Sequence, residues 1–397
     1  MKILALTSLY PNASQPRHGI FIETRLRKLK ALYPDLQLEV LAPVPWFPLA
    51  GRFIASRKAL TAVPATEVRH GIRLYHPRYL AIPGLGMYSN PFFMLLSLLW
   101  FYWRQPDVIK NADVLDGHYI YPDGVAAGWL ARLLKKPLML TARGSDVTHL
   151  PHFRLIKPMI TSAVKNANVA AGVCQALVNE MQLLAPQQPH FEVLRNGIDL
   201  QLFHPLPTEK RAQLRQQRQL DGFFVLLCVG NLIELKGQHL AISALTELPG
   251  TILLLAGQGD MEQALRQQAQ QLQVHDRVIF LGLRTAEMLV EDYNVADLML
   301  LPSSREGWAN VLLESMACGT RVLATSVWGT PEVVAAPAAG TLLAERTVPA
   351  LQAAIAAEMQ QPADRAATRL YAEQFSWDET AHKIYALAQQ LSQSDAR

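Results

Sequence analysis

Short runs of apolar residues recur along the chain, and helical stretches separate them. The runs are continuous and do not alternate with polar residues, which is typical of strands buried on both faces of a parallel sheet. In the first half they lie at residues 2–8, 38–44, 113–119 and 137–144. In the second half they lie at residues 223–231, 251–259, 277–282, 297–304 and 320–326. Because strands and helices alternate in each series, we predict an α/β protein with two doubly wound domains.

Prolines and polar residues mark the boundary between the two series. Pro205 and Pro207 follow the segment VLRNGIDLQLFHP, and residues 209–218 are mostly polar. We therefore predict an N-terminal domain of residues 1–200 and a C-terminal domain of residues 201–376. An amphipathic helix is predicted from about Trp377 to Leu391, and we assign the segment 377–397 to the N-terminal domain.

The composition is that of a globular protein too long for one ordinary core, with 397 residues, 50% hydrophobic and 18% charged. A net charge of +4 without a long Lys/Arg run argues against a nucleic-acid partner. Cys174, Cys228 and Cys318 are scattered, which fits core thiols in a reducing cytoplasm and leaves no motif for a structural zinc site. The N-terminus has only five apolar residues before Thr7, so we expect a buried first strand and not a secretory signal.

Two segments raise the question of a membrane surface. Phe92–Trp103 is the most apolar run and is too short to span a bilayer. It is expected to be either a buried helix or a helix in a membrane interface, with aromatic residues and Arg104 at one end. The segment Ile22–Tyr33 reads as a basic amphipathic helix, for which an ordinary helix packed on the sheet is the alternative.

Candidate chemistry lies just after the strands of the second half. In open α/β sheets ligands bind beyond the carboxyl ends of the strands, and with two domains a cleft between them is the expected site. The segment 230–237 combines two glycines with Lys236, and the segment 257–260 is a second small turn. Neither is a Walker loop, and each alone is equally consistent with a plain strand-to-helix turn.

The segment REGWANVLLESMACGT at 305–320 holds two carboxylates. We predict a helix over residues 311–317, which places Glu306 in the preceding loop and Glu314 on the helix. Backbone amides at a helix start bind anions, so a phosphate there would leave both carboxylates free to accept hydrogen bonds from hydroxyls. Two solvent-exposed surface charges are the alternative.

The pattern E-G-x-x-x-x-x-x-E, followed by A-C-G-T-R-V-L-A-T and G-T-P-E, resembles the signature of the retaining GT-B glycosyltransferases of family 4. Other motifs of that family appear in order: PRHGIF around Gly19, GHYIYPDG around His118, ARGSD at 142–146, RNGID at 195–199 and GNLIELKG at 230–237. The resemblance covers most of the chain, least clearly residues 45–105. The branch that includes the teichuronic-acid-type enzymes is the most similar.

The resemblance implies a GT-B fold of two Rossmann-like domains, with the C-terminal domain binding the donor. Glu314 would bind the ribose hydroxyls, Glu306 the donor sugar, and Lys236 the diphosphate. The remaining donor-binding positions would be Gly230, Asn231, Gly257, Leu283, Gly307, Trp308, Ala309, Asn310 and Val311. Because the family usually has arginine at position 231, Lys236 would carry more of the diphosphate charge, or another cation such as Arg143 would assist.

In the N-terminal domain, which would bind the acceptor, Gly19 would approach the diphosphate and His118 the anomeric region. Arg143 and Asp146 would line the acceptor pocket. The catalytic residues implied are therefore His118, Lys236 and Glu306. With no Asp-x-Asp triplet in the chain, neither a metal nor another cofactor is expected.

The function implied is transfer of a sugar, with retention, from a UDP- or GDP-linked donor to an acceptor hydroxyl. A lipid-linked glycan of bacterial cell-surface polysaccharide synthesis is the expected acceptor. The protein is expected in the cytoplasm, with attachment to an anionic membrane surface as an open alternative. A retaining glycosidase, whose two carboxylates lie about 5–5.5 Å apart, a GT-B sugar-nucleotide epimerase and a catalytically silent nucleotide-sugar-binding subunit are the competing interpretations.

Overall fold

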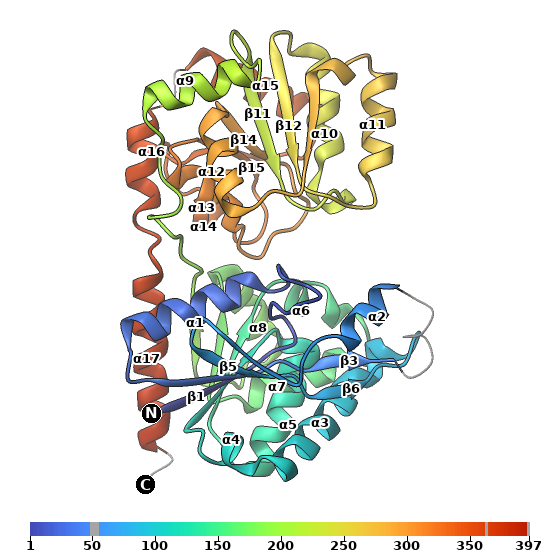
Figure 1. The fold of residues 1–397 in the computed structure, drawn as a ribbon, viewed down its shortest axis with the longest axis vertical. Helices are drawn as coiled ribbons and strands as arrows, with labels where there is room; N and C mark the ends of the chain where they lie inside the picture. The colour runs from blue at the N-terminus through green and yellow to red at the C-terminus, as the bar shows by residue number, and fades with distance from the viewer. Residues whose placement is uncertain (48–54, 362–363, 395–397) are drawn as a thin grey trace. The chain divides into compact units, whose positions relative to one another are not determined.

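The computed structural model describes residues 1–47, 55–361 and 364–394, and the chain divides into two compact α/β units (Figure 1). The first unit contains Met1–Asn196 and the C-terminal helix α17 (Trp377–Ser394), and the second contains Gly197–Ser376. The boundary follows Asn196, whereas we predicted it after residue 200. The end of the predicted segment 377–397 lies outside the described residues.

The first unit is built on an eight-stranded sheet in the order β10-β9-β8-β7-β1-β2-β5-β4. Neighbouring strands run parallel except β4 and β5, which are antiparallel. The strands are β1 (Lys2–Leu6), β2 (Gln37–Leu41), β4 (Thr66–Arg69), β5 (Ile72–Tyr75), β7 (Val114–His118), β8 (Leu138–Ala142), β9 (Val169–Gly172) and β10 (Phe191–Val193). Strands β3 (Val44–Trp46) and β6 (Arg78–Leu80) pair in a small separate sheet.

The helices of the first unit form two groups. Helix α1 (Ile20–Leu32) packs against α17, and α3 (Gly86–Arg104), α5 (Val125–Leu134) and α7 (Lys157–Asn166) pack in succession on one another. The others are α2 (Ala55–Thr61), α4 (Pro106–Lys110), α6 (Ser145–Thr148), α8 (Gln175–Leu184), the 3-10 turn Leu150–His152 and the π turn Ile120–Gly124.

Helix α1 is an ordinary core-facing helix. Ile22, Leu26 and Leu29 are fully buried in the core that also takes in residues of α17, and Lys30 Nζ donates to the carbonyls of Pro34 and Leu36. One basic residue of this helix does not lie at the surface, because Arg25 is 1% exposed. The helical pattern does not predict the burial of Arg25, because a long basic side chain can extend from a polar position toward the core.

Helix α3 contains the apolar segment Phe92–Trp103 and begins six residues before it, at Gly86. Met94, Leu98 and Phe101 are buried, while Phe92 and Trp100 on the opposite face are exposed. The expected buried helix is therefore confirmed for one face of α3, and the opposite face is exposed. Among the described helices, none is long and apolar enough to cross a membrane.

The second unit is built on six parallel strands in the order β13-β12-β11-β14-β15-β16. They are β11 (Phe224–Val229), β12 (Thr251–Ala256), β13 (Val278–Gly282), β14 (Leu298–Leu301), β15 (Val322–Thr325) and β16 (Gly340–Leu343). Its α-helices are α9 (Thr208–Gln217), α10 (Gln238–Ala244), α11 (Glu262–Gln271), α12 (Ala286–Val295), α13 (Asn310–Ala317), α14 (Thr330–Val333), α15 (Val348–Gln360) and α16 (Arg365–Ala372).

The predicted α/β class with two doubly wound sheets is confirmed, and each apolar run that we assigned to a strand contains one. The sequence pattern did not assign seven strands of three or four residues each: β3, β4, β5, β6, β9, β10 and β16. Cys174, Cys228 and Cys318 are buried free thiols, as expected of small core residues.

Candidate active site

The order of strands in the second unit brings two loops to the same edge of the sheet. The chain runs outward from β11 through β12 to β13 and then returns to β14, which pairs with β11 on its other side. The point between β11 and β14 is therefore a topological switch point, where open parallel sheets bind ligands. The loops that follow the two strands are joined by a hydrogen bond of 2.8 Å from Ser304 N to Leu235 O.

Lys236 and Glu306, one from each loop, form an ion pair at this edge. Lys236 ends the 3-10 turn Glu234–Lys236, and its Nζ lies 2.6 Å from Glu306 Oε1. The side chains are only 21% and 10% exposed. The two residues that the sequence assigned to the diphosphate and to the sugar thus neutralise each other in the unliganded protein.

Backbone crowding explains a glycine in each unit. A Cβ atom on Gly257 would lie 1.9 Å from Gly230 O, so the turns after β11 and β12 are in backbone contact. In the first unit Gly19 has a φ of 69°, and a Cβ there would lie 2.1 Å from Leu9 O. Both glycines are therefore required by the fold itself, whether or not a ligand approaches them.

Glu314 lies on α13 and Glu306 in the loop before it, as predicted. Tyr293 Oη donates to Glu314 Oε2 at 2.8 Å. Burial raises the pKa of Glu314 to about 7, and the hydrogen bond from Tyr293 opposes that rise. A carboxyl group that is half ionised near neutral pH can respond to a ligand by losing its proton. Sequence reasoning missed Tyr293, because it lies on a different helix, α12.

The other predicted donor positions surround these loops. The indole of Trp308 is buried and its ring lies 6.1 Å from that of Phe375, so it packs inside the unit. Leu283 is 53% exposed in the turn after β13, and the following Arg284 is bound to Asp292 at 2.7 and 2.8 Å. Ala309 is buried, and Gly230, Gly307, Asn310 and Val311 are partly exposed.

Asn231 is exposed, and an arginine from elsewhere in the chain lies at the same two loops. Arg346 Nε donates to Pro302 O at 2.7 Å, and its Nη2 lies 3.4 Å from Glu234 O. The sequence missed Arg346 because it comes from the loop after β16, more than a hundred residues from position 231. Arg143, which the sequence offered as a substitute cation, belongs to the first unit.

In the first unit His118 is completely buried at the end of β7. Arg143 Nη2 lies 3.0 Å from His118 Nδ1, and Asp116 Oδ2 lies 3.3 Å from His118 Nε2. Burial lowers the pKa of His118 to about 4, so the ring is neutral at pH 7. An arginine N–H can donate only to an unprotonated ring nitrogen, which fixes the tautomer with the proton on Nε2.

The sequence did not predict two further buried charges of the first unit. Arg25 and Asp116 are fully buried, and within the described part of the chain no hydrogen bond reaches the guanidinium of Arg25. Burial lowers the pKa of Arg25, and the charge of Asp116 opposes that change. Arg143 is tied to Asn196 Oδ1 at 3.0 Å, and burial lowers its pKa well below the ordinary value.

Asp146 and Asp123 hold the loops at this edge of the first sheet. Asp146 accepts hydrogen bonds from the amides of Ile120, Arg143 and Gly144, so its carboxylate is directed at backbone and not at an open pocket. Asp123 accepts from Ser8 N at 2.7 Å, and burial raises its pKa to about 7. Asp123 belongs to the motif GHYIYPDG, yet the sequence analysis had assigned it no role.

Two doubly wound units whose second sheet presents Lys236 and two glutamates at its switch point define the class of the GT-B glycosyltransferases. The profile of the family Glycosyl transferases group 1 matches residues 210–375. The teichuronic acid biosynthesis glycosyltransferase TuaC of Bacillus subtilis (strain 168) is 31% identical over 337 residues, which cover 83% of this chain and 82% of TuaC. The chain belongs to the group 1 glycosyltransferases, and the family resemblance found in the sequence is confirmed.

Solved structures agree with this fold. Sucrose-phosphate synthase from Thermosynechococcus elongatus is 19% identical, with a TM-score of 0.78 over 99% of both chains. Anabaena HepE, solved in complex with UDP, is 21% identical, with a TM-score of 0.73 over 98% of this chain and all of HepE (100%). At these identities the likeness concerns the GT-B architecture.

A double-mutant cycle tests the ion pair of Lys236 and Glu306. Lys236→Met leaves a nearly buried carboxylate without its cation, and we expect it to lower the free energy of unfolding by about 1–3 kcal/mol. Adding Glu306→Gln should restore most of that loss, so the coupling energy should be about 1–2 kcal/mol. Denaturant titration of each variant measures the free energy of unfolding of the second unit.

The pair Arg266–Glu262 is the matched control, because it lies in the same unit at 2.8 Å but is 52% and 36% exposed. Its coupling should be under about 0.5 kcal/mol. Equal coupling in the two pairs would show that burial adds nothing to the Lys236–Glu306 interaction.

Proposed function

We propose that the protein transfers a sugar from a nucleotide-diphosphate donor to an acceptor hydroxyl with retention of the anomeric configuration. The observation that carries this proposal is the Lys236–Glu306 ion pair at the switch point of the second sheet. Support also comes from HepE, whose structures contain UDP, UDP with glucose, and UDP-glucose. We infer a UDP- or GDP-linked donor from this chemistry.

The diphosphate of the donor competes with Glu306 for Lys236. A dianionic group attracts the lysine more strongly than one carboxylate does, so donor binding would open the ion pair and free Glu306 to accept a hydrogen bond from the sugar. Backbone amides at the start of α13 would add to the anion site. Arg346 would be the second cation in place of the arginine that the family usually has at position 231.

The chemical step needs no protein nucleophile. The bond from the anomeric carbon to the phosphate oxygen breaks, and the acceptor oxygen bonds to the same face of the carbon. The acceptor's proton goes to the departing phosphate oxygen, and Lys236 stabilises the charge that develops there. Because cations of the chain take this task, we propose that no metal ion is needed.

The remaining donor contacts follow from the positions of the loops. Glu314 would accept from the ribose hydroxyls, and the turn at Leu283 would face the base. The amides of residues 307–310 would line the sugar. Backbone at Gly230 and Gly257 would lie along the nucleotide, next to the exposed Asn231.

We assign the acceptor side to the first unit. His118 is neutral and can hydrogen-bond a sugar hydroxyl near the anomeric carbon once its ring is exposed. Arg143 holds that ring, and Asp146 holds the loop that carries Arg143. Gly19 allows the end of the loop after β1 to pack against the carbonyl of Leu9 in the same loop. These residues therefore position the acceptor pocket.

We propose a lipid-linked glycan of bacterial surface polysaccharide synthesis as the acceptor, with the reaction in the cytoplasm. The similarity to TuaC, a teichuronic acid biosynthesis glycosyltransferase, supports this choice. The intact Lys236–Glu306 pair beside α13 favours a transferase over a catalytically silent subunit. A glycosidase would leave the glycine turns and Lys236 without a task.

Hydrolysis of a panel of UDP- and GDP-sugars, without acceptor, tests the proposed donor chemistry. We expect slow release of free sugar from one donor and a fall of about 100-fold or more in turnover for Lys236→Met, because one group stabilising the leaving charge contributes about 2.7–4 kcal/mol. Lys210→Met, on the exposed face of α9, is the control and should leave the rate unchanged. Donor binding without turnover would favour the silent subunit, and inversion at C2 or C4 of the sugar would favour an epimerase.

Glu314 predicts a pH dependence of donor affinity. Ribose hydroxyls donate to the ionised carboxylate, whose unliganded pKa is about 7. Below that pH the donor must displace a proton, so the affinity should fall up to tenfold per pH unit as the pH decreases from about 7. Above pH 7 the affinity should level off.

Titration calorimetry between pH 5.5 and 8.5, with the donor found in the panel, measures this curve. Such a donor has no phosphate group that titrates in the range. Glu314→Gln should bind the donor more weakly at high pH, and its donor affinity should not change between pH 5.5 and 8.5. An equal fall in donor affinity below about pH 7 in Glu314→Gln would contradict the assignment of Glu314 to the ribose.

A further inference from the structure

Helix α3 presents a continuous apolar face to solvent. Six large apolar side chains at steps of three or four residues, each 41–76% exposed, form this face, which we call the α3 stripe: Leu85, Tyr88, Phe92, Leu96, Trp100 and Trp103. No charged residue occurs between Gly86 and Trp103. Scattered apolar residues are normal on protein surfaces, but a contiguous patch marks an interaction site.

The chemistry of the α3 stripe matches a membrane interface. Four of its six residues are aromatic, and tyrosine and tryptophan prefer the boundary between acyl chains and headgroups. Arg104 follows at the end of the helix, and its Cζ lies 4.6 Å from the centre of the Trp100 ring. Trp100, Trp103 and Arg104 therefore place aromatic rings and a cation together at one end of the helix, a combination found at membrane interfaces.

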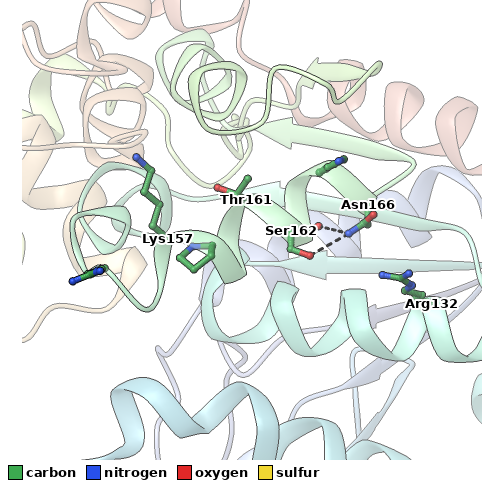
Figure 2. A pocket seen from close by; sticks show the side chains of 8 residues that line it. Arg132, Lys157, Thr161, Ser162 and Asn166 are labelled. Carbon is green, nitrogen blue, oxygen red and sulfur yellow. Dashed lines mark hydrogen bonds between the residues drawn. The ribbon is translucent and has the colours of Figure 1, made fainter.

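A hollow of about 760 Å³ lies between α5 and α7 of the same unit (Figure 2). Its lining, which we call the basic hollow, contains four cations and no acid: Arg132, Arg154, Lys157 and Lys165, with Pro158, Thr161, Ser162 and Asn166. Arg132 projects from α5, and Lys157, Thr161, Ser162 and Asn166 belong to α7. In the described part of the chain, no carboxylate pairs with any of the four cations and no acceptor takes a hydrogen bond from them.

The α3 stripe and the basic hollow belong to one layer of helices. Helix α3 packs on α5, and α5 packs on α7, so the three lie next to one another (Figure 1). An apolar strip and a set of unpaired cations therefore occur on neighbouring helices. Four like charges around one hollow repel each other, and a bound anion relieves that repulsion.

We propose that the layer α3–α5–α7 docks on an anionic phospholipid bilayer. The α3 stripe enters the boundary between headgroups and acyl chains, and the basic hollow binds the phosphate of an anionic lipid headgroup. A second copy of the chain would bring the same four cations and add to the repulsion. The proposal does not depend on the donor chemistry above, since it rests on a different surface.

Flotation of the full chain with lipid vesicles tests the proposal. In about 0.1 M salt, where surface charges still act over about 10 Å, the chain should bind phosphatidylcholine vesicles with about one-third phosphatidylglycerol at least ten times more strongly than pure phosphatidylcholine. Trp100→Ser/Trp103→Ser should lower anionic binding at least tenfold. Lys157→Ala/Lys165→Ala should lower it about 25-fold, about fivefold for each lysine near the surface.

Two exposed residues elsewhere provide matched controls. Leu183→Ser removes a leucine that is 78% exposed on α8, and Lys210→Ala removes an exposed lysine of the second unit. Both should leave vesicle binding within about twofold of the parent chain. If Trp100→Ser/Trp103→Ser unfolds at a lower temperature than the parent chain, Phe92→Ser/Leu96→Ser takes its place. Donor hydrolysis in solution should be unchanged in the stripe variants, which separates this result from the transferase reaction.

Three results would overturn the proposal. The parent chain could fail to float with either vesicle. It could bind both vesicles equally, with no loss in Lys157→Ala/Lys165→Ala. Light scattering could instead show a dimer that Trp100→Ser/Trp103→Ser converts to monomers, in which case a second copy of the chain covers the stripe.

Discussion

The parallel pairing of β11 with β14 is the constraint on which the second unit depends. The paired residues Leu226 and Leu298 are 72 positions apart in the chain, yet the return from β13 to β14 makes the two strands neighbours. Their loops then leave the sheet at the same edge, and Lys236 meets Glu306 at 2.6 Å. Without this crossover, Lys236 and Glu306 would lie at separate places along the sheet edge. The loops after β11 and β14 could then not form one site.

Charge balance connects this geometry to the proposed chemistry. A lysine and a glutamate that are 21% and 10% exposed stabilise the unliganded loops by neutralising each other. In the proposed reaction, the same pair exchanges its internal contact for contacts with a diphosphate and a sugar hydroxyl. In the first unit the balance is different, because His118 is buried, neutral and held between Arg143 and Asp116.

Much of the fold was predictable because apolar runs report buried parallel strands directly. The loop position of Glu306 and the helical position of Glu314 followed from Gly307 and from the apolar run after Asn310. Tyr293 and Arg346 were not predictable, because each reaches the site from an element distant in sequence, and no spacing rule connects them to the motif. The burial of Arg25 was not predictable, because helical periodicity gives the direction of a Cβ atom and not the end of a long side chain.

We propose that donor binding transfers Lys236 from Glu306 to the diphosphate. A crystal structure of the full chain with UDP or GDP bound measures this most directly. In that structure we expect Lys236 Nζ to contact a phosphate oxygen, the 2.6 Å contact with Glu306 to be broken, and Glu314 to accept hydrogen bonds from the ribose hydroxyls. A nucleotide bound elsewhere, with Lys236 and Glu306 still paired, would contradict it.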